Sequence, residues 1–388
     1  MAKILDYIAK ETHGQCFASY KYCFDSMEMP HLLYDVQEST YHNLNKFAEN
    51  NHDPNSRDLR SLAESCMKGE PLFHYFLDGS RKVYKVDDIQ YDNKVYPVIC
   101  GQISVACCER LMRNVSEYDS FRHFDEEVYN VLCLPVKANM DGADSTSFFN
   151  NLCKKVNDTP FGARANLRKV LYYFTQINGN ETLENKAIAK IQDDMIECEK
   201  SIVARMTAMH LLSQDRYLIK DGSIQYKPMK SGDYKELAKI RNNYRHVIGV
   251  SKSFNPDLMK DKKGHSNAGE IARLPLFHRT PAFLWEPGAE WGNERFAIWY
   301  VRIRDKRFTA TPYSGILKIE KMLMTGSEHE EGLSSDEIDI ITANIINERN
   351  PVCYGNDARW ANHLYPVYMT ESYCKSRFAS DHYFINLF

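Results

Sequence analysis

Two aspartates in this sequence share an unusual local setting. Asp78 lies in FLDGS and Asp221 lies in IKDGS, so each follows an apolar segment and precedes Gly-Ser. A carboxylate at a strand end projects toward the edge of a sheet, and the glycine lets a ligand approach the backbone closely. Two such oxygen ligands on neighbouring strands suit Mg²⁺ or Mn²⁺. Aspartate and glycine are also favoured in turns, so either motif alone more often marks a turn.

Other charged residues extend this set along the chain. Glu197 and Glu199 lie in a segment whose apolar residues recur at helical spacing, and Glu199 falls toward the apolar side. A carboxylate on a packed face is costly unless it is paired or binds a metal, although most helical glutamates are solvated. Lys252 follows a short strand in VIGVSKS and is suited to hold a phosphate or orient a water. Glu371 is a late carboxylate that we expect to reach the same site; a surface lysine and a surface helix end are the ordinary alternatives for these two.

Composition narrows the classes of protein to consider. There are 49 basic and 52 acidic side chains, a net charge of −3, so a nucleic-acid site would be a local groove. The number of cysteines, 11, is odd, and the sequence has no CxxC motif. Both observations argue against a disulfide framework or a structural zinc site. No phosphate loop, GxGxxG, HExxH or GxSxG motif occurs. No apolar run reaches the roughly 18 residues of a membrane span, and the start is unlike a secretory signal, so we expect a cytoplasmic protein.

The candidate residues need a sheet that brings them together. The patterns predict a strand-rich block, a long helix, and then alternating strands and helices, which is a mixed α/β plan. Residues 1–70 are expected to form a helical N-terminal extension and 71–388 the main domain, with an unexplained insert at about 135–182. The strands are expected within 71–134 and at 216–223, 246–250 and 296–303, the helices at 183–213, 233–244, 336–349 and 363–380, and a loop at 326–335.

In this order, the residues resemble the ligand set of RNase H-like nucleases, and four segments resemble motifs of the NurA nuclease family. The segments are FLDGSRK, YLIKDGSI, HVIGVSKSF and LYPVYMTESY, within a match from about Leu72 to the C-terminus. The resemblance implies an RNase H-like mixed sheet flanked by helices. It also implies a metal-dependent DNA end-processing nuclease that uses Mn²⁺ or Mg²⁺. A two-metal site with ions about 3.5–4 Å apart would activate water and stabilise the leaving oxygen.

The resemblance also assigns roles to individual residues. Asp78, Asp221 and Glu199 (or Glu197 in its place) would be metal ligands, and Lys252 the motif lysine. Where the family has a closing histidine, this sequence has a tyrosine, Tyr373. We therefore expect Glu371, two positions earlier, to replace that histidine as a metal ligand; His363 and His382 are weaker substitutes.

Partners follow from the same resemblance. It implies a homodimer that works with a HerA-type hexameric ATPase, in DNA repair or anti-phage defence. We expect a DNA channel lined by the basic stretches 227–230, 235–245 and 260–263, with Trp285, Trp291 and Trp299 available to stack on bases. Two alternatives stay open. One is a catalytically inactive RNase H-like (PIWI-type) nucleic-acid-binding module, because the histidine is missing, and the other is a regulatory subunit of an ATPase complex.

Overall fold

A computed structural model shows how these segments fold. It describes residues 4–17, 21–26, 41–42, 46–111, 120–140, 142, 144–177, 179, 181–226, 234–257, 259–260, 263–287, 294–309, 311–349 and 360–388. The helices are α1 (Ile4–Glu11), α2 (Arg60–Cys66), α3 (Ser145–Asn157), α4 (Gly162–Ala165), α5 (Leu183–Ala208), α6 (Tyr234–Asn243), α7 (Ala268–Arg273), α8 (Gly326–Glu331), α9 (Ser335–Asn347), α10 (Tyr365–Ser376) and α11 (Asp381–Ile385).

The described residues also form the strands of one large and one small sheet. They are β1 (Gln15–Cys16), β2 (Tyr22–Cys23), β3 (Tyr41–His42), β4 (Arg57–Asp58), β5 (Phe73–Tyr91), β6 (Lys94–Leu111), β7 (Ser120–Pro135), β8 (Leu167–Tyr173), β9 (Tyr217–Asp221), β10 (Val247–Ser251), β11 (Met259–Lys260), β12 (His278–Arg279), β13 (Phe283–Trp285), β14 (Phe296–Arg302) and β15 (Ile316–Met322).

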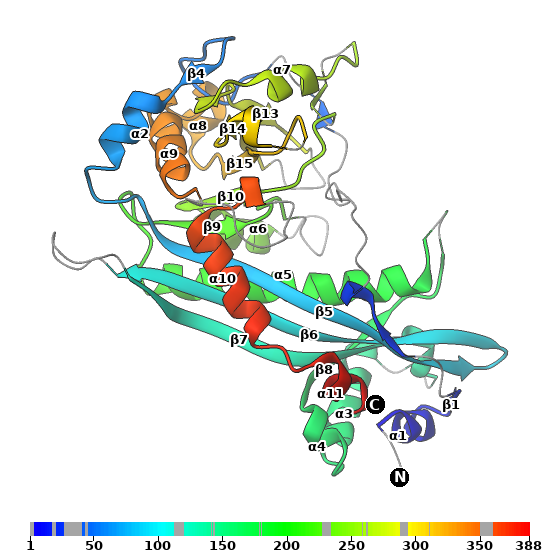
Figure 1. Cartoon of the computed structure of the whole chain (residues 1–388). Coiled ribbons are helices and arrows are strands. Elements are labelled where there is room, and N and C mark those ends of the chain that lie inside the picture. The colour runs from blue at the N-terminus through cyan, green and yellow to red at the C-terminus, as the bar shows by residue number, and fades with distance from the viewer. Residues whose placement is uncertain are drawn as a thin grey trace.

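One mixed sheet dominates the fold, with the strand order β4-β12-β14-β15-β10-β9-β5-β6-β7-β8. The long strands β5, β6 and β7 form an antiparallel meander, and β9 and β10 then add in parallel beside β5. Figure 1 shows the meander as the longest ribbons of the molecule, with helices on both sides. This arrangement confirms the mixed sheet flanked by helices that the sequence predicted.

Two different helices cover the two faces of the central strands. In Figure 1, α10 crosses in front of the sheet while α5 runs behind it. The apolar side of α5 packs with Leu77 and Leu218, whereas Phe76, Ile219 and Val250 pack on the other face with residues of α9 and α10. Because successive side chains of a strand point to opposite faces, this packing fixes the direction of the neighbouring side chains along β9, β10 and the part of β5 around Leu77.

Residues 1–70, expected to be a helical extension, contain short strands as well as helices. Among the described residues of this region, α1 and α2 are helical, but β1 and β2 pair with β5, and β4 pairs with β12. The physical reason is the length of β5: the 5-residue β9 covers only its first part, and the short β1 and β2 pair with the exposed edge that remains.

Two other segments also differ from, or add to, the sequence interpretation. The expected loop at 326–335 contains α8, which begins with a reciprocal capping box between Thr325 and Glu328. The unexplained insert at about 135–182 forms α3, α4 and β8, and β8 pairs in parallel with β7. The insert therefore extends the sheet beyond the meander.

Candidate active site

Three carboxylates meet where β9 ends. One oxygen from each of Asp78, Asp221 and Glu371 lies within 4.8 Å of the other two. The β5–β9 register pairs Leu77 with Lys220, so the next residue of each strand, Asp78 and Asp221, lies side by side on the α10 face. Glu371 comes from α10, which is held against β5 by a hydrogen bond from the Cys374 thiol to the Asp78 carbonyl at 3.4 Å. Residues distant in sequence thus form one carboxylate triad.

Lys252 supplies a cation at this triad. Its Nζ lies 2.9 Å from Asp221 Oδ2 and 2.8 Å from Glu371 Oε2, and its side chain is only 8% exposed. Lys375, one turn along α10 from Glu371, pairs with the other oxygen of that glutamate at 2.8 Å. The arrangement brings the predicted Lys252 and Glu371 together with both aspartates.

Burial and neighbouring charges have opposing effects on the pKa values of several of these groups. Burial, followed by repulsion from Asp221, raises the pKa of Asp78 well above its usual range. Burial would also raise the pKa of Glu371, but the ammonium groups of Lys252 and Lys375 outweigh it and lower that pKa. Burial would lower the pKa of Lys252, yet the three carboxylates together raise it. The triad therefore concentrates negative charge, and a cation stabilises it.

Glu199 lies on the other side of the sheet. It is 2% exposed on α5, and its Oε2 lies 3.1 Å from the Nζ of Lys220. Lys220 points to the α5 face because it precedes Asp221 on β9, and its Nζ also donates to the Asp221 carbonyl at 2.6 Å. Burial raises the pKa of Glu199, an effect that Lys220 opposes. Glu197, its proposed substitute, pairs with Lys200 at 2.6 Å and is 38% exposed.

The first Asp-Gly-Ser motif contains glycine for a reason of space. A Cβ at Gly79 would lie 2.5 Å from Glu199 Oε1 and 3.2 Å from Met195 side-chain atoms. Only glycine lets the carboxylate of Glu199 approach the backbone beside Asp78 so closely. In the second motif the glycine has a conformational role, because Gly222 has a φ of 84°.

Two buried side chains that the sequence analysis missed fix the loops of the site. Glu320, on β15, accepts hydrogen bonds from Ser223 Oγ at 2.8 Å and from the Ile224 N–H at 3.0 Å, which anchors the loop after Asp221. Asn362 donates to the Lys252 carbonyl at 2.9 Å. Glu320 sits within an apolar strand pattern and Asn362 in no recognisable motif, so no local signal pointed to either.

Other predicted contacts lie away from the triad. The Tyr373 hydroxyl donates to Glu126 of β7 at 2.8 Å, and its ring stacks on His123. His363 is buried and stacks on Tyr368, and His382 lies on α11.

The expected aromatic stacking platform was partly wrong. Trp285 and Trp299 are buried in the core, where a base cannot reach them. Trp291, the stretch 227–230 and residues 261–262 lie outside the described residues. Within the described ranges, no helix combines the length and apolarity that crossing a bilayer requires.

Comparison with known proteins gives a remote structural likeness. No protein-family model matches the sequence, and no curated protein sequence matches it. Among solved structures, the chain is similar to the NurA nuclease from Sulfolobus solfataricus, with 10% sequence identity and a TM-score of 0.38, over 81% of this chain and 82% of that one.

Proposed function

We propose that this protein is a divalent-metal-dependent nuclease that hydrolyses phosphodiester bonds in DNA. The observation that carries the proposal is the convergence of Asp78, Asp221 and Glu371 around the ammonium of Lys252. The donor set fits a hard cation, since all three groups offer carboxylate oxygens. Packing the buried Asp78 against the half-buried Asp221 and Glu371 is also costly without compensating positive charge. Of the two lysines at the triad, Lys375 is 55% exposed and compensates this charge only weakly.

Each residue of the site then has a role. The triad would hold Mg²⁺ or Mn²⁺, which, when bound, polarises a phosphate and lowers the pKa of water. Lys252 contacts two of the three carboxylates and thereby orients them, and its ammonium can stabilise the negative charge of a phosphate at the same place. Asn362 holds the backbone of Lys252, and Glu320 holds the loop that follows Asp221.

We propose one ion at the triad in place of the two expected from the sequence. Glu199, the fourth predicted ligand, faces Lys220 on the α5 side of the sheet and is not among the carboxylates that meet within 4.8 Å. Glu199 would instead support the site through Lys220, whose Nζ holds the Asp221 carbonyl. Titration of the protein with Mn²⁺, followed by electron paramagnetic resonance, measures this directly: we expect one bound ion per chain.

The proposal also includes a substrate and a partner. The resemblance of the four motifs supports DNA as substrate, a homodimer, and a HerA-type hexameric ATPase as partner. The sequence contains no phosphate loop. Any ATP-driven unwinding would therefore come from that partner.

The test is a cleavage assay on end-labelled single- and double-stranded DNA with Mn²⁺, Mg²⁺ or EDTA, with and without a HerA-type ATPase. We expect metal-dependent cleavage that Asp78→Asn and Asp221→Asn each lower by more than about 100-fold, beyond the effect of residues that only support ligands. Asp193→Asn is the matched control, because this aspartate pairs with Lys190 on the exposed side of α5. Full activity in both triad variants would refute the proposal. Metal-independent DNA binding without any cleavage would point to the inactive binding module.

A further inference from the structure

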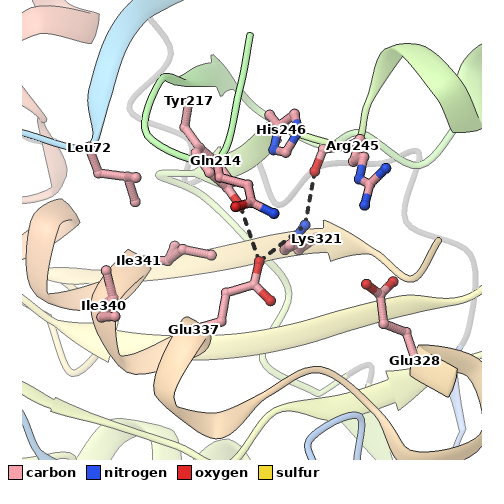
Figure 2. Close-up of a pocket in the computed structure, with 10 residues that line it drawn as sticks. All are labelled: Leu72, Gln214, Tyr217, Arg245, His246, Lys321, Glu328, Glu337, Ile340 and Ile341. Atoms are coloured by element: carbon pink, nitrogen blue, oxygen red, sulfur yellow. Dashed lines mark hydrogen bonds and ion pairs between the residues drawn. The ribbon is translucent and has the colours of Figure 1, made fainter. Parts of the chain in front are cut away.

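A separate cavity of about 340 Å³ lies at the opposite end of the same strands. Tyr217, in its wall, begins β9, whereas Asp221 of the triad ends it. At about 3.3 Å per residue, the two positions are roughly 13 Å apart along the strand. Figure 2 shows the lining residues, which are Leu72, Gln214, Tyr217, Arg245, His246, Lys321, Glu328, Glu337, Ile340 and Ile341.

We call this space the Lys321 cavity. Its nitrogen groups have few hydrogen-bond or charge partners. Lys321 is 3% exposed, its Nζ donates to the Arg245 carbonyl at 3.0 Å, and its carboxylate partner, Glu337, is 3.6 Å away. Burial lowers the pKa of this lysine despite that carboxylate. The Nδ1 of His246 is buried and has no hydrogen-bond partner among the described residues. Buried nitrogen groups in this state are costly, and an incoming acceptor would relieve them.

Arg245 adds a second cationic group at the opening. The residue is exposed, and its guanidinium makes no hydrogen bond or ion pair with the described parts of the chain. Figure 2 shows this guanidinium on the same side of the cavity as the Lys321 ammonium and the His246 ring. Three kinds of nitrogen group therefore surround one space.

The carboxylates of the cavity, in contrast, already have donors. Glu328 Oε2 accepts from the backbone N–H groups of Met324 and Thr325 in the cap of α8. Glu337 Oε1 accepts from the Tyr217 hydroxyl at 3.1 Å. The acids have donors, whereas the Arg245 guanidinium has no acceptor among the described residues and the Lys321 ammonium has only a carbonyl and a carboxylate 3.6 Å away. The missing partner is therefore an anion.

The shape of the cavity indicates what else the anion carries. Its opposite wall is formed by Leu72, Ile340 and Ile341, and Ile340 is 44% exposed despite its apolar side chain. The volume lies in the lower part of the range of about 300–1,000 Å³ for small-molecule sites. A phosphate monoester presents three terminal oxygens to the three nitrogen groups, whereas a carboxylate presents two.

We propose that the Lys321 cavity binds a phosphate monoester of nucleotide size, with the phosphate at Lys321, Arg245 and His246 and the organic part on the isoleucine wall. Two sources share this chemistry: a free mononucleotide and the 5′-phosphorylated end of a DNA strand. The inference is independent of cleavage at the triad, because the two sites lie at opposite ends of β9 and β10.

Isothermal titration calorimetry in EDTA tests the site with dTMP, thymidine and inorganic phosphate. We expect dTMP to bind the wild type and thymidine not to bind. Arg245→Gln, at an exposed position, and Lys321→Met are each expected to weaken dTMP binding by at least 10-fold. Glu337→Gln is expected to strengthen it several-fold, because that change removes a competing charge. Lys235→Gln, an exposed lysine on α6, is the control and is expected to leave dTMP binding unchanged.

A second arm separates the two sources. Oligothymidylates with a 5′-phosphate or a 5′-hydroxyl are compared in wild type and Arg245→Gln. A preference for the phosphorylated strand that depends on Arg245 assigns the cavity to a DNA end, and binding of dTMP alone assigns it to free nucleotides. Equal dTMP binding in wild type, Arg245→Gln and Lys321→Met, or equal binding of dTMP and thymidine, would overturn the proposal. Asp78→Asn is expected to bind dTMP like the wild type, which keeps this result distinct from the triad.

Discussion

Replacing Lys252 by methionine removes the buried cation that separates the carboxylates of the triad. Its Nζ lies 2.9 Å from Asp221 and 2.8 Å from Glu371, and Asp78 is buried beside them. Loss of one partner from a buried ion pair costs about 3–5 kcal/mol. We take about 3 kcal/mol, the lower end, because Lys375 still pairs with Glu371.

This free energy converts into a measurable melting shift. An unfolding entropy of about 2.1 cal/mol/K per residue gives roughly 0.8 kcal/mol/K for this chain, so the Tm of Lys252→Met falls by about 4 °C in EDTA. The vacated triad is more negative and binds Mn²⁺ more tightly than the wild type does. At 100 times the Kd, a bound ion stabilises the folded state by about 2.7 kcal/mol, which restores about 3 °C.

Differential scanning fluorimetry over a Mn²⁺ series, with and without EDTA, checks both effects. Lys200→Met is the control: Lys200 pairs with Glu197 on α5, so its loss destabilises the protein without changing the response to Mn²⁺. An unchanged Tm for Lys252→Met in EDTA, or equal Mn²⁺ stabilisation of that variant and the wild type, would refute the role given to Lys252.

Three further predictions concern the surroundings of the site and the cavity. Gly79→Ala is expected to lower the free energy of unfolding by about 1–3 kcal/mol in urea titrations, because the new Cβ would meet Glu199 Oε1; Gly326→Ala, where a Cβ meets open space, is expected to change little. Glu320→Gln breaks a buried ion pair with Lys318 and weakens the anchor of the loop after Asp221, so we expect a loss of about 3 kcal/mol together with slower DNA cleavage. Burial, with the charges of nearby cations, lowers the pKa of His246 to about 4. The unfolded state therefore takes up the proton first, so stability is lost as pH falls from about 6.5 to about 4, by roughly 1–2 kcal/mol after screening, and His246→Gln lacks this loss in pH-dependent urea unfolding.

The sequence predicted both aspartates of the site, but the expected strand end was right only for Asp221. Asp78 lies inside β5, which continues through Gly79 and Ser80 to Tyr91. Asp78 and Asp221 were recognisable because each ends an apolar segment before Gly-Ser, and parallel pairing of β5 with β9 then brings them together. Lys220 and Glu320 were not recognisable, because a charged residue inside an apolar strand has no local signature until its partner across the fold is known. The N-terminal strands were missed for a related reason: β1 and β2 have two residues each, and their conformation depends on the free edge of β5.

Lys220 and Asp221 are adjacent in sequence but serve opposite faces of the sheet, and this alternation gives the last prediction. Lys220→Met leaves Glu199 buried on the α5 face without its cation, which costs about 3–5 kcal/mol. The double variant with Glu199→Gln removes the stranded charge, so it is expected to be more stable than Lys220→Met alone, a coupling that a double-mutant cycle in urea measures. Glu199→Gln by itself is expected to retain one Mn²⁺ per chain, because the triad carboxylates lie on the α10 face. Loss of Mn²⁺ binding in Glu199→Gln with the fold intact would show that this glutamate crosses to the metal, and additive free energies in the cycle would show that Lys220 does not hold it.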